Sequence, residues 1–121
     1  MAKDLGISVL LDFYGDMLTE KQRDVVELYY NEDLSLAEIA EHSGITRQGV
    51  RDSIKRAEAQ LKEYEERLGL AERFHTMGEG LEESQRLARE AARTNQRRGV
   101  DLEIERCLNE IGTIAARLGD M

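Results

Sequence analysis

Long side chains that donate hydrogen bonds recur along one face of a predicted helix, and their chemistry suits nucleic acid. Arg and Gln bond bidentately to guanine and adenine edges, and Arg and Lys neutralise phosphates. The alternative is a plain helical hairpin with a solvated cationic face. We favour a nucleic-acid-binding site, and the candidate residues are Thr46, Arg47, Gln48, Arg51, Lys55 and Arg56.

The residues around this face have the sequence of a helix-turn-helix over positions 34–61. Ser35 and Glu38 are spaced as a capping box at the start of the first helix. Gly44 falls where that helix must stop, since glycine adopts positive φ at no steric cost. Thr46 is placed to cap the second helix, which would present the candidate residues as a recognition helix does.

The predicted recognition helix is longer than this motif needs. Its apolar residues are spaced 4, 3, 4, 3 and 4 apart, which is the heptad spacing of helices that pack side by side. We expect the helix to cover residues 47–68, about 33 Å, and to leave the small domain and meet another helix. The apolar residues are Val50, Ile54, Ala57, Leu61, Tyr64 and Leu68.

A second basic patch lies further along the chain, where arginines recur three or four residues apart on one helix face. They are Arg86, Arg89, Arg93 and Arg97. Such a row suits the phosphate backbone of RNA. We favour the alternative, in which the row is solvated and pairs with acids of the next helix, namely Glu103, Glu105 and Glu110.

The composition predicts an all-α protein. The chain of 121 residues has no proline, 35% charged residues and 5% aromatic residues. Its net charge of −8 excludes a protein that coats nucleic acid nonspecifically, and would confine binding to the two basic patches. Since no apolar segment reaches membrane-spanning length and no signal-peptide pattern occurs, we expect a soluble cytoplasmic protein without a membrane partner.

Residues suited to catalysis or metal binding are few. The single cysteine, Cys107, is expected in an apolar core, and His42 and His75 are isolated and expected at or near the surface. No phosphate-binding glycine loop and no nucleophile–base pair occurs. We therefore expect neither an enzyme nor a bound metal or cofactor.

The other helices are expected to be joined by glycine turns. They lie near residues 5–14, after a capping Thr19, at 81–97 and at 101–118, with the main break at Gly78 and Gly80 and a weaker one at Gly69. Residues 1–68 would form a helix-turn-helix domain with its extended helix, and residues 69–121 a C-terminal helical extension.

The extension has no core of its own beyond its helix faces, so it must pack on the extended helix, on a second copy, or on both. We expect a homodimer. The expected interface combines the end of the extended helix, from position 57 onward, with a stripe near the C-terminus. The stripe consists of Ile104, Leu108, Ile111, Ala115 and Leu118.

Residues 18–61 resemble region 4 of bacterial sigma factors. The likeness covers the Leu-Thr start of a leading helix, the Ala-Glu-Ile-Ala helix and the Gly-Ile-Thr-Arg turn. In that family the second motif helix reads a promoter element. The resemblance implies a DNA-binding, sigma region 4-like fold, although the chain has no room for the other sigma-factor domains.

Three stretches within about the first 65 residues are more specifically similar to the YlxM family of small bacterial proteins. They cover residues 12–23, 26–41 and 46–58, and include Leu-Thr-Glu-Lys-Gln-Arg and Glu-Leu-Tyr-Tyr. After residue 68 the likeness lies only in being helical. The family's gene usually lies beside that of the signal recognition particle GTPase, so the resemblance implies a regulator of that pathway.

Two functions follow from these patterns and the resemblance. One is a nucleic-acid-binding regulator, with DNA or RNA as partner, that regulates or assists the signal recognition particle pathway. The other is an accessory that does not bind DNA and contacts the particle's GTPase or its RNA directly.

Overall fold

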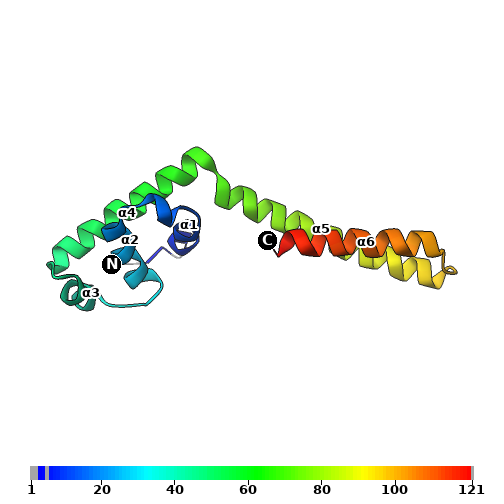
Figure 1. Cartoon of the computed structure of the whole chain (residues 1–121), viewed down its shortest axis with the longest axis horizontal. Coiled ribbons are helices and arrows are strands. Elements are labelled where there is room, and N and C mark those ends of the chain that lie inside the picture. Colours follow the sequence, from blue (N-terminus) through cyan, green and yellow to red (C-terminus); the bar gives the residue numbers. More distant parts are fainter. Residues whose placement is uncertain (1–2, 5, 121) are drawn as a thin grey trace. The chain divides into compact units, whose positions relative to one another are not determined.

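The computed structural model describes residues 3–4 and 6–120, and α-helices make up most of this part of the chain (Figure 1). The elements are α1 (Gly6–Tyr14), the 3-10 turn η1 (Gly15–Met17), α2 (Glu20–Tyr30), α3 (Leu36–Ser43), α4 (Arg47–Leu68), α5 (Leu70–Arg97) and α6 (Leu102–Gly119). They form two compact units, Met1–Ala71 and Glu72–Met121. The all-α prediction is confirmed, and the expected helix start at residue 5 lies outside the described residues.

The helix ends of the first unit follow the local signals in the sequence. Thr19 and Ser35 each form a capping box with the Gln or Glu three positions later, at the starts of α2 and α3. Gly44 ends α3 with φ of 68°, and the Thr46 hydroxyl accepts a 3.0 Å hydrogen bond from the Gly49 amide at the start of α4. These predicted caps are confirmed, and they fix where α4 begins.

The core of the first unit is built around α4, which packs against α1, α2 and α3. One cluster joins α4 to α2 and α3, and consists of Val25, Tyr29, Ile39, Val50 and Ile54. The other joins α4 to α1 and α2, and consists of Ile7, Leu11, Tyr14, Leu18, Val26, Ala57 and Leu61. Because α4 contributes to both clusters, its buried face is fixed, and most of the polar side chains of its first turns lie on the exposed side.

The expectation that the heptad face of α4 meets a helix outside the domain is wrong. Ala57 and Leu61 are fully buried, and the side chains that cover them include Ile7 and Leu11 of α1. Only Leu68, which is 45% exposed, remains open at the end of this face. The apolar face for which the heptad spacing predicted an external partner is thus covered by α1, which lies more than forty residues earlier in the chain.

In the second unit α5 and α6 lie side by side as a hairpin (Figure 1). The predicted break at Gly78 and Gly80 is wrong, because α5 runs without interruption from Leu70 to Arg97. The break lies at Gly69 instead, which adopts φ of 62° and ends α4. Two interior glycines weaken a helix by about 1 kcal/mol each, and the long run of good helix formers around them outweighs this cost.

The contact between α5 and α6 uses small side chains. Ala88 and Ala115 are the buried residues of the two helices, and Leu108 and Gly112 lie beside them half-buried. Cys107 is exposed, so the prediction of a core thiol is wrong. It lies one position before Leu108, on a side of α6 that α5 does not cover.

Candidate nucleic-acid interface

Two predicted site residues, Thr46 and Arg47, lie at the start of α4, and their side chains have different roles. The Thr46 side chain is committed to capping the helix through the Gly49 amide. Arg47, directly after it, is exposed and makes no ion pair with any residue that the structure describes. A free cation in the first turn, beside backbone N–H groups that lack helical partners, forms a place where an anion is stabilised.

Gln48 and Arg51 contact each other one turn apart. The Arg51 guanidinium donates a 3.3 Å hydrogen bond to Gln48 Oε1, and Gln48 Nε2 donates one of 2.9 Å to Asp52 Oδ1. These bonds hold the two side chains along the helix surface. Reading a base would require exchanging them for bonds to the base edge, which exposed hydrogen bonds permit at small net cost.

Lys55 and Arg56 continue the basic face along α4. Both are exposed, and within the described part of the chain neither pairs with an acid. Arg56 also lines a shallow groove between α4 and the start of α2. Lys21 and Ser53 line the same groove and were not predicted as site residues. No sequence signal connects Lys21 to Arg56, since only the packing of α2 on α4 brings them to one groove.

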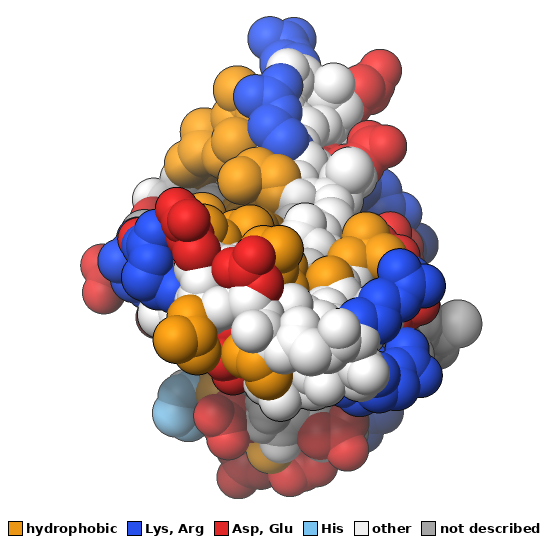
Figure 2. Space-filling view, turned by 90° about the vertical axis from the view of Figure 1, so that its right-hand side faces the viewer, with side chains coloured by type: hydrophobic (Ala, Val, Ile, Leu, Met, Phe, Trp, Pro, Cys, Tyr) orange, Lys and Arg blue, Asp and Glu red, His pale blue; other side chains and the backbone are white. Residues whose placement is uncertain are grey.

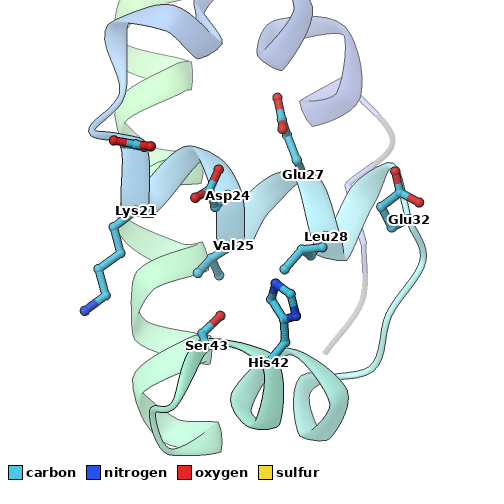
Figure 3. A pocket seen from close by; sticks show the side chains of 9 residues that line it. Lys21, Asp24, Val25, Glu27, Leu28, Glu32, His42 and Ser43 are labelled. Carbon is cyan, nitrogen blue, oxygen red and sulfur yellow. The ribbon is translucent and has the colours of Figure 1, made fainter.

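A second groove, between α2 and α3, has the opposite charge. Glu20, Asp24, Glu27 and Glu32 line it, with one cation, Lys21, at its edge. Figure 3 shows His42 of α3 beside Leu28 of α2, with the carboxylates of Asp24 and Glu27 projecting from α2. Four carboxylates against one cation give this groove a negative charge, which would repel a phosphate.

His42 and His75 are both exposed, as expected for isolated histidines. His75 pairs with Glu79 one turn later at 2.6 Å. Within residues 3–4 and 6–120, no group of three His, Cys, Asp or Glu side chains is arranged to hold a metal ion. No helix in the described part of the chain is both long and apolar enough to cross a membrane.

The second basic patch lies on α5, where all four predicted arginines are exposed. Arg86 pairs with Glu83 and, at 3.2 Å, with Glu90 of its own helix. The hydrogen bond from Arg86 holds the pKa of the Glu83 carboxyl below its usual value. Arg97 donates a 3.1 Å hydrogen bond to Thr94.

The favoured pairing of this row with acids of the next helix is wrong. Glu105 accepts a hydrogen bond from Gln96 at 2.9 Å, and Glu110 pairs with Arg106 of its own helix at 3.4 Å. Arg89 and Arg93 make no ion pair with any described residue. Arg89 lines a groove between α5 and α6, but no acidic side chain of the described residues lines that groove, so it offers Arg89 no ion pair.

Comparison with known proteins gives a family for this chain. A family model described as "UPF0122: Putative helix-turn-helix protein, YlxM / p13 like" matches residues 1–98. The match therefore extends through the first unit and all of α5, beyond the roughly 65 residues that carry the sequence motifs.

Several curated relatives carry the family's name. The chain is 57% identical to the UPF0122 protein of Clostridium kluyveri over 72 residues, which are 60% of this chain and 65% of the relative. It is 53% identical over 77 residues to that of Desulforamulus reducens, covering 64% and 66%. It is 51% identical over 81 residues to that of Halalkalibacterium halodurans, covering 67% and 74%. The match thus spans slightly less than two thirds of the first two relatives.

Proposed function

We propose, from the premise that this chain belongs to the UPF0122 family of YlxM/p13-like helix-turn-helix proteins, that it is a cytoplasmic regulator that binds nucleic acid through α4. The observation that carries the proposal is a set of exposed cations on α4, Arg47, Lys55 and Arg56, that make no ion pair with any described residue. Cations that are not neutralised within the protein are available to phosphates.

The side chains on this face divide into two roles. Arg47, Lys55 and Arg56 contact phosphates and orient the helix, and Lys21 extends the phosphate contact from α2. Gln48 and Arg51 reach base edges once their mutual hydrogen bond is exchanged. Thr46 acts indirectly, because its hydroxyl holds the start of the helix. On this proposal the first unit acts as the sigma region 4-like arrangement that residues 18–61 resemble.

Binding titrations at several salt concentrations test this proposal. Fluorescence anisotropy with duplex DNA and with structured RNA should give an affinity that falls with salt, with a slope near the number of phosphates contacted. The Arg47→Ala/Arg51→Ala double variant should bind more weakly and remain folded. Equal binding by the double variant and the wild type would remove α4 from this role.

The second candidate function is direct contact with the signal recognition particle, through its RNA or its GTPase. The observation that favours it is the exposed pair Arg89 and Arg93 on α5, which have no acidic partner among the described residues. Arginines one turn apart on a helix suit consecutive phosphates of a folded RNA. On this proposal the α5 row, and not α4, carries the specific contact.

Replacing the four arginines of the α5 row by glutamine separates the two functions. Helix propensity stays nearly constant, so stability should change little. Binding to purified particle RNA or GTPase should fall, while DNA binding through α4 should persist. A variant that binds the particle as well as the wild type would refute the role of this row, and a large loss of stability would make the row structural.

We also propose that the protein acts as a homodimer through its C-terminal helices. The support is exposed apolar surface on α6, where Ile111 is 49% and Ile114 is 40% exposed. Pairing would supply the two half-sites that a short helix-turn-helix needs for tight binding. Ile111→Asp should therefore give a monomer that keeps its helices, which light scattering and circular dichroism would detect.

A further inference from the structure

One face of α6 has the spacing of a coiled-coil seam and is not used inside the hairpin. It comprises Ile104, Cys107, Ile111, Ile114 and Leu118, which are spaced 3, 4, 3 and 4 apart. All five are exposed, and the four aliphatic side chains are 40–49% exposed. We call these five residues the α6 seam.

The α6 seam differs from the stripe expected from sequence. Leu108 and Ala115 of that stripe turn toward α5, with Ala115 only 5% exposed. Cys107 and Ile114 lie on the exposed face of α6 instead. In the view of Figure 2 hydrophobic side chains also lie at the surface between charged ones. Apolar residues repeated at this spacing on an open helix face are typical of a helix-pairing surface.

We propose that the α6 seam pairs with the α6 seam of a second copy of this chain in antiparallel orientation. The inference rests on the homodimer proposed above, and specifies its surface and direction. Nucleic acid is not a fitting occupant, because the seam itself carries no cation. What selects a second copy is the order of charges along the edge of the seam.

That edge is acidic at its start and basic at its end. Glu103, Glu110 and Arg117 follow one another at intervals of seven residues, so they lie in one row beside the seam. Glu110 pairs with Arg106 of its own helix at 3.4 Å, and both side chains are exposed, so Glu110 can exchange or share this pair. An antiparallel two-fold pair places Glu110 opposite Arg117 of the second copy, and the symmetry repeats the contact. A parallel pair offers no such ion pair, because the other edge of the seam carries Leu108 and Ala115, which turn toward α5.

The charge pairing also sets the register. With Glu110 beside Arg117 of the second copy, Ile111 lies against Ile114 and Cys107 against Leu118 of that copy. The two Cys107 residues are then about 16 Å apart along the helices, beyond the reach of a disulfide. Wild-type protein should therefore resist oxidation to a covalent dimer, whereas a cysteine at position 118 should lie opposite Cys107.

Oxidative crosslinking of the full chain tests this arrangement. Leu118→Cys should form a covalent dimer on a nonreducing gel, and Cys107→Ser/Leu118→Cys should not, because equivalent positions are too far apart. Rapid disulfide formation between wild-type Cys107 residues would overturn the antiparallel orientation. A protein that is dimeric by light scattering but shows no Leu118→Cys crosslink would overturn the seam while leaving the homodimer intact.

A charge exchange tests the register independently. Glu110→Lys should raise the dimer dissociation constant about tenfold, since two ion pairs become two repulsions. Adding Arg117→Glu should restore it to within about threefold of wild type. No restoration in the double variant would overturn the proposed pairing. Wild-type monomer at tens of micromolar would overturn both the seam and the homodimer, and anisotropy on the same samples would show separately whether α4 binds nucleic acid.

Discussion

The Tyr14 hydroxyl donates a 2.6 Å hydrogen bond to Glu65 Oε1, linking the end of α1 to the last turns of α4. The same hydroxyl accepts a 3.0 Å bond from the Leu70 amide, and Glu65 Oε1 accepts one of 3.0 Å from the Ala71 amide. Two side chains from different helices therefore satisfy the first N–H groups of α5, which no residue of α5 itself can do.

Removing the Tyr14 hydroxyl should destabilise the first unit. Tyr14→Phe leaves the Leu70 amide without its acceptor in a partly buried place, and should lower the melting temperature by about 5 °C. Thermal denaturation followed by circular dichroism would measure it. Tyr64→Phe is the matched control, because the Tyr64 hydroxyl makes one 3.3 Å bond, to the Met17 carbonyl, and its loss should cost less. Equal effects of the two variants would contradict the special role of Tyr14.

Stability should fall at alkaline pH through two tyrosines. Burial, and then the hydrogen bonds to Glu65 and Glu58, raise the pKa of Tyr14 and of Tyr30 above 10.0. Below about pH 10 both tyrosines are neutral in the folded and unfolded states, so their full contribution is present. Above it the unfolded state ionises first, so this contribution is lost as pH rises.

The pH prediction is measured by urea denaturation at a series of alkaline pH values. The wild type should lose stability more steeply than Tyr14→Phe/Tyr30→Phe, which cannot ionise at these positions. The part of the tyrosinate absorbance that is missing in Tyr14→Phe/Tyr30→Phe should rise only above pH 10 in the folded wild type. Parallel pH profiles for the two proteins would contradict the prediction.

Removing Asp52, the one acid between Arg47 and Arg56, should strengthen nucleic-acid binding. Asp52 accepts a hydrogen bond from Gln48 and lines the groove beside Arg56. Asp52→Asn keeps the size of the side chain and removes a charge that repels phosphate, so affinity should rise severalfold at low salt. Anisotropy titrations would measure the change, and weaker binding would contradict the proposed orientation of α4.

Cations on α4 should differ in importance according to their position. Arg47→Ala and Lys55→Ala should each flatten the salt dependence of binding by about one unit of slope. Arg67→Ala is the matched control: it lies at the far end of the same helix and pairs with Glu63 at 3.0 Å. A slope that changes equally in all three variants would indicate a nonspecific effect of charge.

Glycines inside α5 should be replaceable with a gain in stability. A Cβ atom added at Gly78 or Gly80 meets no atom within 4 Å, and each position is helical. Gly78→Ala and Gly80→Ala should each stabilise the second unit by about 1 kcal/mol. Gly69→Ala should lower the stability of the protein, because Gly69 has φ of 62°, which alanine adopts only with strain. Chemical denaturation of the three variants would test whether α5 is continuous.

The sequence by itself determined the features that depend on near neighbours. The caps at Thr19, Ser35 and Thr46 and the left-handed turn at Gly44 each involve atoms within about four residues. Hydrogen bonds between a side chain and a nearby amide form wherever the right residue stands, and so can be read from spacing alone. For the same reason the start of α4, and the order of polar residues along it, followed from sequence.

Only the tertiary structure decided which faces are covered. The spacing marked Ala57 and Leu61 as apolar, but could not tell that α1 would cover them. It placed Cys107 on an apolar face of α6, but the small residues at the α5–α6 contact leave that thiol exposed. Lys21 lines the groove beside Arg56 only because α2 packs on α4. Periodicity identifies the apolar face of a helix. Burial of that face depends on which distant segment packs on it, and this depends on the interactions of the whole chain.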